Sequence, residues 1–210
     1  IAYHLVRTFV PQGGTLFDPF AGVGTIPFEG CLNGKHAYGM DISPLAYYVS
    51  SAKMQRCTID DCHAVIERLQ EFIENVHFPR GYVARNSRFG FNKTLAEYYN
   101  DQTFREILAA RLFFQQNEPQ TTAEMMVIAS LLHILHGNRP YALSRKSHPI
   151  VPYAPTGDAV YKNLIEKVTE KVERSVAEPY PRCFVGGQMY LGDSTAAWPN
   201  ELNQLDAIIT

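Results

Sequence analysis

The sequence predicts an α/β fold in which a parallel sheet is interrupted by a large, mainly helical insertion. Strand-like segments at 15–18 and 36–41 each lead into a helix-like segment, an order that is typical of parallel sheets. Strand-like segments return only at 188–191 and 205–210, and helical patterns dominate the long stretch between. Because consecutive parallel strands are ordinarily joined by one helix and short loops, an inserted subdomain is the simplest explanation.

The organisation of the chain follows from this pattern. We expect residues 1–56 to form the first part of the sheet core, residues 57–182 to form the insertion, and residues 183–210 to return to the sheet. The last segment, 205–210, has the apolar, β-branched profile of a buried parallel strand, and no turn follows it. Because the sequence also lacks a starting methionine, we expect it to be a fragment of a longer polypeptide.

Local signals mark the elements of the first part. The glycine-bearing loop 19–25 leads from the first strand into a helix that is expected to stop near Asn33. Ser43 followed by Pro44 has the pattern of a helix N-cap and a first-turn proline. This pair predicts a helix that runs to about Arg56.

Helical patterns fill the insertion. Apolar residues follow helical spacing over 60–76, and an amphipathic helix with a charged outer face is expected from Val160 onward. Thr94–Glu97 and Thr121–Glu124 both match the capping-box pattern, which predicts two further helix starts. The second of these helices, over about 123–136, is apolar nearly all round and is expected to be buried.

Composition excludes several classes of protein. The 210 residues are 46% hydrophobic, with 19 basic and 21 acidic side chains, as in a soluble globular protein. No run approaches the roughly 18 apolar residues of a membrane-spanning helix. The net charge of −2 leaves any nucleic-acid binding to local patches. The cysteines form no CxxC pair and have no histidine at ligand spacing, so we expect no metal site and reduced thiols in the cytoplasm: Cys31, Cys57, Cys62 and Cys183.

The loop from Asp18 to Thr25 stands at a junction of strand and helix, where backbone N–H groups favour an anionic group. It lacks the third glycine of a dinucleotide-binding loop and the Gly-Lys-Ser/Thr of a Walker loop, and the charge of Asp18 opposes a pyrophosphate. A ligand with a positive charge beside a carboxylate suits it better, because Asp18 can pair with an ammonium while the loop N–H groups meet the carboxylate. S-adenosylmethionine has this arrangement of charges.

A second acidic residue, Asp41, ends the second strand. Its position predicts hydrogen bonds with ribose hydroxyls, by the geometry of the acidic residue in dinucleotide folds. Ile42 and Leu45 would then flank the adenine. The plainer alternative is that the glycine pair of the loop only makes a tight turn.

The same residues resemble a known family. Asp-Pro-Phe-Ala-Gly-Val-Gly-Thr, residues 18–25, is similar to the cofactor motif of S-adenosylmethionine-dependent amino-methyltransferases that act on DNA. Gly39–Ser43 is similar to the ribose-binding acidic motif of that family, and Tyr190–Ser194 to the segment whose aspartate contacts the adenine amino group. The segment 205–210 is similar to the strand before the catalytic tetrapeptide, in which Pro-Pro-Tyr or Pro-Pro-Phe follows a Ser, Asn or Asp. The four segments stand in the order of the family, and the resemblance as a whole covers about a third of the chain.

The resemblance implies a Rossmann-like methyltransferase core with S-adenosylmethionine as cofactor. It also implies that the methyl acceptor is an exocyclic amine of a DNA base, cytosine N4 or adenine N6, in a modification system. The catalytic residues are expected directly after Thr210, so none is assigned within the chain. Plainer roles stay open for Phe20, as a core residue, and for Asp193, as a turn residue. The predicted cofactor-binding residues are Asp18, Pro19, Phe20, Ala21, Gly22, Gly24, Thr25, Asp41, Ile42, Leu45 and Asp193.

Two stretches, 80–93 and 138–156, hold basic residues and no acidic ones. Both are rich in aromatic and loop-forming residues, so their cations are placed to meet the phosphates of double-stranded DNA. Because both stretches lie in the insertion, the resemblance implies that residues 57–182 form the target-recognition subdomain. The alternative is that they are ordinary solvated loops. His133 and His136 lie on the apolar helix and are interpreted as packing or capping residues. The predicted nucleic-acid-binding residues are Arg80, Arg85, Arg88, Lys93, Arg139, Arg145 and Lys146.

Two other functions remain open. RNA guanine-N2 methyltransferases have the same loop and a similar tetrapeptide, although a large insertion between the second and third strands favours DNA over RNA. In the second alternative, the chain is an inactive subunit that binds the cofactor and contributes to recognition of the target sequence. Cytosine-5 chemistry is disfavoured, because no Pro-Cys pair is present to supply its nucleophile.

Overall fold

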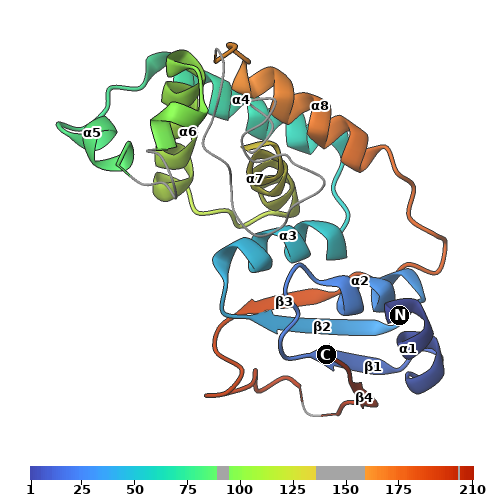
Figure 1. Cartoon of the computed structure of the whole chain (residues 1–210). Helices are drawn as coiled ribbons and strands as arrows, with labels where there is room; N and C mark the ends of the chain where they lie inside the picture. Colours follow the sequence, from blue (N-terminus) through green and yellow to red (C-terminus); the bar gives the residue numbers. More distant parts are fainter. Residues whose placement is uncertain (89–94, 136–158, 203) are drawn as a thin grey trace. The chain divides into compact units, whose positions relative to one another are not determined.

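The structure is a computed structural model of the whole chain (Figure 1). It describes residues 1–88, 95–135, 159–202 and 204–210. Among these residues, no helix combines the length and apolar character that crossing a bilayer requires.

The chain divides into two compact units, and each is described by itself. The sheet unit comprises residues 1–58, 120–129 and 176–210, and the helical unit comprises residues 59–119 and 130–175. Residues 120–129 therefore group with the sheet, although they lie in the middle of the expected insertion. The role of 57–182 as a target-recognition insertion stays a prediction.

The sheet unit contains a four-stranded sheet in which every neighbouring pair is parallel. Its strands are β1 (Thr15–Asp18), β2 (His36–Asp41), β3 (Gln188–Leu191) and β4 (Ala207–Ile208), in the spatial order β3-β2-β1-β4. The α/β class is thus confirmed, and the sheet is compatible with a Rossmann-like core. Since β2 and β3 lie on one side of β1 and β4 on the other, the strand order reverses between β1 and β4.

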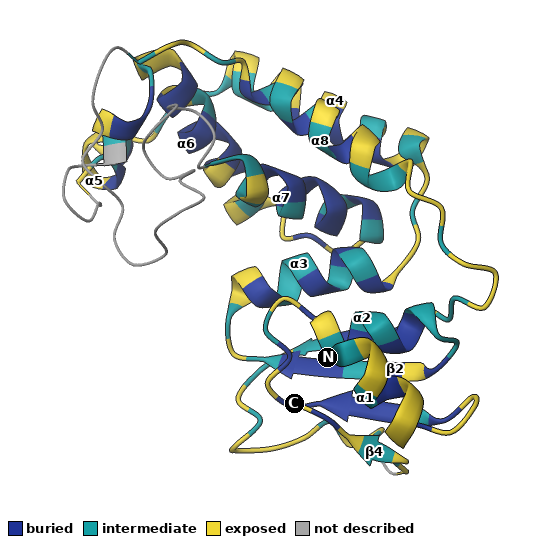
Figure 2. Cartoon of the chain, turned by 45° about the vertical axis from the view of Figure 1, so that its right-hand side comes forward, coloured by how far each residue is buried: buried dark blue, intermediate teal, exposed yellow. Residues whose placement is uncertain are grey.

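Three helices of the sheet unit share a hydrophobic core with one face of the sheet. They are α1 (Ala2–Phe9), α2 (Thr25–Leu32) and α3 (Pro44–Met54). Strand residues Leu16, Ala37 and Met189 belong to this core together with Cys31 of α2 and Met54 of α3. In Figure 2, β1 and β2 are mostly dark blue, as expected for strands that carry a core.

Side chains of the opposite strand parity lie on the other face of the sheet, because successive residues of a strand alternate. Tyr38 of β2 stacks with Tyr190 of β3 at a centroid distance of 6.4 Å. Phe17 of β1 is fully buried and meets Trp198 edge to face at 5.0 Å. The connection between β3 and β4 therefore covers Phe17.

The helix boundaries of the first part agree closely with the sequence. The α2 helix ends at Leu32, and Asn33 is its C-cap. The Ser43 side chain accepts a hydrogen bond from the Ala46 N–H at the start of α3. The α3 helix stops at Met54, two residues before the expected end. The α1 helix was not expected.

The helical unit is built from α4 (Ile59–Asn75), α5 (Tyr82–Asn86), α6 (Asp101–Gln116), α8 (Leu164–Val176) and a short 3₁₀ helix, η1 (Leu95–Tyr98). The α4 and α6 helices pack together, and Phe72 meets Phe113 at 5.5 Å. The α7 helix (Thr122–Ile134) begins in the sheet unit and ends in the helical unit.

One of the two predicted capping boxes is confirmed. Glu124 N–H donates to Thr121 Oγ1 at 3.2 Å, and Thr121 N–H donates back to Glu124 Oε2 at 3.0 Å. The other box does not begin a long helix, since only η1 follows, and Thr94 lies outside the described residues. The long helix α6 instead starts after Asn100, whose side chain accepts from the Gln102 N–H at 3.0 Å.

Two further expectations are corrected. The last helix begins at Leu164 and not near Val160, which is 58% exposed. The reason is a contact with α6: Glu106 Oε2 accepts a hydrogen bond from the Leu164 N–H at 2.9 Å, which caps the start of α8. The predicted strand 205–210 pairs only over β4, forms an edge of the described sheet, and leaves Ile208 52% exposed.

Candidate functional site

Three predicted acidic residues lie at the carboxyl edge of the sheet. Asp18 is the last residue of β1, Asp41 is the last residue of β2, and Asp193 follows β3 by two residues. The parallel pairing brings these strand ends to one edge, where the Gly192 N–H donates to the Asp41 carbonyl at 3.0 Å. Ligands of open α/β sheets bind outside this edge, at the point where the strand order reverses.

Asp18 is the buried charge of this edge, with 3% of its surface exposed. Burial raises the pKa of its carboxyl, and repulsion from Asp41 adds to this. Hydrogen bonds from the Phe20 N–H, at 3.0 Å, and from the Thr210 side chain lower the pKa in part. Asp18 and Asp41 end neighbouring parallel strands, and β4 pairs with β1 on the other side, so its carboxyl end lies at the same edge. A buried carboxylate of this kind gains from a cationic partner.

Asp41 is half-buried, and its carboxylate accepts hydrogen bonds from two backbone N–H groups. Its Oδ2 accepts the Gly22 N–H at 2.8 Å, and its Oδ1 accepts the Ser43 N–H at 2.9 Å. Each carboxylate oxygen can accept more than one hydrogen bond, so both retain capacity for a ligand hydroxyl. Asp41 therefore holds the glycine loop and the start of α3 and keeps acceptor capacity for a hydroxyl group.

The backbone N–H groups of the glycine loop are mostly engaged within the protein. Besides Phe20 and Gly22, Ala21 donates to the Met40 carbonyl at 2.9 Å, and Gly24 donates to the Ala21 carbonyl at 2.8 Å. The expectation that the loop as a whole offers its N–H groups to an anion is therefore wrong for these four. The first-turn N–H groups of α2, at Thr25 and Ile26, have no carbonyl within the helix to bind.

The two glycines of the loop have positive φ angles, 51° at Gly22 and 74° at Gly24, which L side chains rarely adopt. Gly24 also has no room for a side chain, because a Cβ there would lie 2.7 Å from Ser50 Oγ. Ser50 is fully buried in α3 and donates its hydroxyl to the Gly22 carbonyl at 2.9 Å. Sequence reasoning missed Ser50, and the available signal was its spacing of four residues from buried Ala46 on the predicted helix.

Apolar side chains stand exposed around the same edge. The exposed fractions are 60% for Phe20, 71% for Ile42, 50% for Leu45 and 49% for Leu191. The core alternative for Phe20 is thus wrong. Leu191, at the end of β3, was not predicted as a site residue. Exposed apolar groups gathered at a strand edge are typical of a place where a flat apolar group binds.

The remaining loop residues and Asp193 have simpler surroundings. Pro19 and Ala21 are buried, and Thr25 is exposed. Asp193 Oδ1 accepts both the N–H of Thr195 at 2.9 Å and its hydroxyl at 2.7 Å, and these bonds lower the pKa of the Asp193 carboxyl. These bonds agree with the alternative role of Asp193 as a turn residue. Asp193 nevertheless follows β3 at the carboxyl edge of the sheet.

The predicted nucleic-acid contacts belong to the helical unit as far as they are described. Arg80, Arg85 and Arg88 are exposed in and around α5. His133 is exposed near the end of α7, so it is not a packed core residue. The other predicted residues lie outside the described residues: Lys93, His136, Arg139, Arg145 and Lys146.

A hollow of about 660 Å³ lies at the amino ends of β1 and β2, away from the predicted cofactor residues. Arg7, Pro11, Gln12 and Lys35 are among the residues that line it. Lys35 is 4% exposed, and its ammonium donates to the Pro11 carbonyl at 2.9 Å. We therefore assign its charge to holding the chain before β1, and we place the candidate site at the carboxyl edge on grounds of topology and of the paired carboxylates.

Over 49 residues the chain is 43% identical to the Type II methyltransferase M.MvaI of Kocuria varians. The matched segment makes up 23% of this chain and 11% of that protein, so the similarity is local. No family model and no solved structure matches the chain. The local similarity supports a methyltransferase.

Proposed function

We propose that the carboxyl edge of the sheet binds S-adenosylmethionine, and that the protein transfers its methyl group to an exocyclic amine of a DNA base, cytosine N4 or adenine N6. The observation that carries this proposal is the convergence of buried Asp18 and half-buried Asp41 on one glycine loop at the reversal of the strand order. The local similarity to a Type II methyltransferase supports it. In this proposal the sheet unit is a Rossmann-like core.

The two carboxylates divide the recognition of the cofactor. Asp18 pairs with the ammonium of the methionine part, which relieves the cost of burying its charge. Asp41 accepts hydrogen bonds from the ribose hydroxyls with its remaining lone pairs. A dinucleotide fits less well, because its pyrophosphate would meet the carboxylates of Asp18 and Asp41.

Apolar residues hold the adenine. Ile42 and Leu45 flank the ring, Phe20 closes the loop side, and Leu191 adds an apolar contact from β3. The Asp193 carboxylate accepts a hydrogen bond from the adenine amino group. Its lone pairs that are not bonded to Thr195 are available for this. Burial of these exposed side chains against the base gives part of the affinity.

S-adenosylmethionine supplies an electrophilic methyl group when bound. The residues of this chain orient it, because the loop, Asp18 and Asp41 fix the methionine and ribose parts from two neighbouring strands. Orientation of this kind accounts for much of the rate of a displacement in which two reactants must align. The target base must leave its stack to reach the edge, at a cost of a few kcal/mol.

Calorimetry with S-adenosylmethionine tests the binding half of the proposal. Tritiated methyl transfer by the full-length polypeptide to duplex DNA or to transfer RNA tests the reaction. We expect micromolar binding and label in DNA. Label in transfer RNA alone would favour a guanine-N2 enzyme, and binding without transfer to either substrate would favour an inactive specificity subunit. Failure to bind the cofactor would overturn the proposal.

A further inference from the structure

We propose that α5, α6 and the segment before α5 form one phosphate-binding surface for a nucleic-acid backbone. Two arginines of α6 that show no sequence motif, Arg105 and Arg111, join Arg80, Arg85 and Arg88 in it. We call these five residues the arginine surface. The inference rests on the proposed function and deepens it, since it names the part of the helical unit that holds the polynucleotide.

A stacked aromatic pair ties the two helices of this surface together. Phe78 and Tyr82 lie almost parallel, with centroids 5.6 Å apart and an interplanar angle of 6°. The guanidinium of Arg105 lies over the Phe78 ring, 5.7 Å from its centroid. Arg105 of α6 therefore lies close to the segment that carries Arg80, two residues after Phe78.

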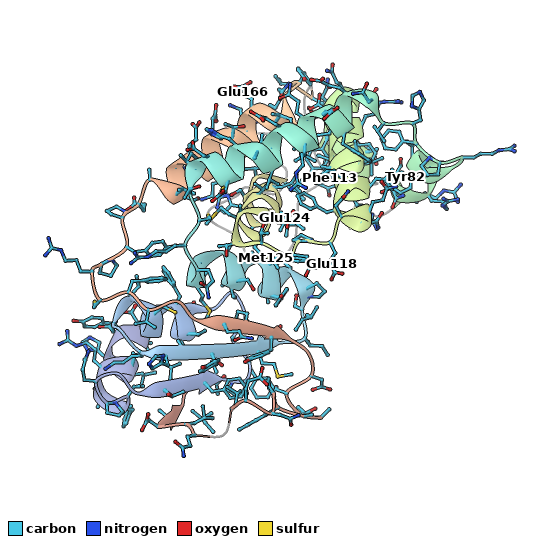
Figure 3. All side chains as sticks on the ribbon, turned by 180° about the vertical axis from the view of Figure 1, so that it is seen from behind. Tyr82, Phe113, Glu118, Glu124, Met125 and Glu166 are labelled. Carbon is cyan, nitrogen blue, oxygen red and sulfur yellow. The ribbon has the colours of Figure 1, made fainter. Side chains whose placement is uncertain are left out.

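Tyr82 makes the second connection between the helices. It is 8% exposed, and its hydroxyl meets Gln115 Oε1 of α6 at 3.3 Å. Arg111 precedes Gln115 by four residues on α6, so the two side chains lie on the same face of that helix. Figure 3 labels Tyr82 where α5 meets α6. Phe78 and Tyr82 thus connect the α5 region to α6, and Arg105 packs on this aromatic pair.

The charges of these arginines are not neutralised. All five are exposed, and none forms an ion pair with any residue that the structure describes. Residues 76–88 contain no acidic side chain. The nearest acid along α6, Glu106, is turned to α8: its Oε1 accepts the Tyr161 hydroxyl at 2.9 Å, and its Oε2 accepts the Leu164 N–H at 2.9 Å.

This charge pattern fits a row of phosphates. Each guanidinium is a planar fork that can hold two phosphate oxygens at once, and it keeps its charge at any physiological pH. The surface uses arginine at all five positions and offers no lysine. A protein of net charge −2 gains little from nonspecific attraction to nucleic acid, so a local concentration of unpaired cations is what binding requires.

The test is the double variant Arg105→Gln/Arg111→Gln of the natural protein. Affinity for a fluorescent DNA duplex is measured by anisotropy over a series of salt concentrations. We expect a loss of about tenfold or more, and a slope of log affinity against log salt that is shallower by about 1.8, since each lost phosphate contact removes about 0.9. The matched control, Lys171→Gln/Arg174→Gln on α8, removes the same charge and should keep the slope.

The outcomes separate this inference from the proposed function. Calorimetry with S-adenosylmethionine is run on the same samples. An unchanged DNA affinity and salt slope in the α6 variant would overturn the arginine surface, while cofactor binding would leave the proposed function standing. Equal loss in the α8 control would also overturn it, because only total charge would then matter. Equal binding of polyglutamate and DNA would contradict nucleic acid as the partner. If the α6 variant unfolds, Arg80→Gln/Arg85→Gln tests the same surface with residues outside α6.

Discussion

The two units of the chain place their charges differently. In the sheet unit two charged residues, Asp18 and Lys35, are buried, and the candidate site depends on a carboxylate taken out of water. In the helical unit the arginines of α5 and α6 are exposed. A buried charge is selective for a small ligand that replaces the lost water, whereas exposed charges suit a long polyanion. If the difference is functional, cofactor binding and nucleic-acid binding can be lost separately.

The largest expected effect breaks the sheet unit alone. Asp41→Ala removes the proposed ribose acceptor and frees the Gly22 and Ser43 N–H groups. Hydrogen bonds to a charged group contribute about 1.5–3 kcal/mol, so affinity for S-adenosylmethionine should fall about ten- to a hundredfold in calorimetry. Asp60→Ala, an exposed acid of α4, is the control and should leave it unchanged. Equal affinities of Asp41→Ala and the unmodified protein would remove Asp41 from the site.

The next effect concerns the helical unit alone. Replacing Arg85 and Arg88 by glutamine should lower DNA affinity about tenfold at moderate salt and flatten its salt dependence, because two phosphate contacts disappear. Cofactor affinity should not change, since both residues belong to the other unit. Filter binding at several salt concentrations measures the first quantity, and calorimetry measures the second. A fall in both would mean that the two activities are not separable.

The contrast between the units also explains what the sequence could predict. The strand-end motifs were readable because proline, glycine and aspartate mark the backbone directly, and Asp18 and Asp41 end neighbouring parallel strands. Ser50 was missed because its partner, the Gly22 carbonyl, lies 28 residues away in the chain. The spacing of Ser50 from Ala46 indicates which face of α3 it shares, but the hydrogen bond itself depends on how α3 packs against the loop.

In the helical unit, the Thr94–Glu97 pattern predicted a helix start, and the short 3₁₀ helix η1 follows it. The long helix α6 is capped by Asn100 instead, which is followed three residues later by Thr103 and not by an acid. Thr103 is fully buried and exchanges hydrogen bonds with the backbone of Lys162, at 2.8 Å and 3.1 Å. Its role is visible only once the segment before α8 is in place. Arg105 and Arg111 were missed because the part of the chain that packs on this face of α6, around Phe78 and Tyr82, is distant in sequence.

A smaller effect is expected at Ser50, which shapes the loop without a proposed ligand contact. Ser50→Ala leaves the Gly22 carbonyl without its buried donor, a change that costs about 1–3 kcal/mol in general. Most of this should appear as lower stability in urea unfolding, and cofactor affinity should fall about fivefold as the loop loosens. Ser51→Ala, at a half-buried neighbour, should change neither. A stable variant with full affinity would show that the loop holds its shape unaided.

The smallest expected effect is a change in the free energy of unfolding when Asp18 is replaced by asparagine. Most substitutions of buried residues destabilise a protein, whereas this one should stabilise it. Because burial raises the pKa of this carboxyl above 3.8, the folded state keeps the proton at a pH where the unfolded state has lost it. Ionisation therefore destabilises the fold as pH rises through the raised pKa. Asp18→Asn should then be slightly more stable than the unmodified protein at pH 7, and the gap should close as pH is lowered toward 3.8.

The same substitution should weaken binding of S-adenosylmethionine, because the ammonium loses its partner. Urea unfolding from pH 7 to pH 4, with and without the cofactor, measures both changes. A variant that is less stable than the unmodified protein at pH 7 would mean that the Phe20 and Thr210 contacts outweigh the cost of burial. Asp18 would then be a structural anchor of the loop. A gain in stability of Asp18→Asn together with a loss of cofactor affinity would instead show that the sheet unit keeps this charge buried to bind its ligand. The exposed charges of the arginine surface carry no such cost of burial.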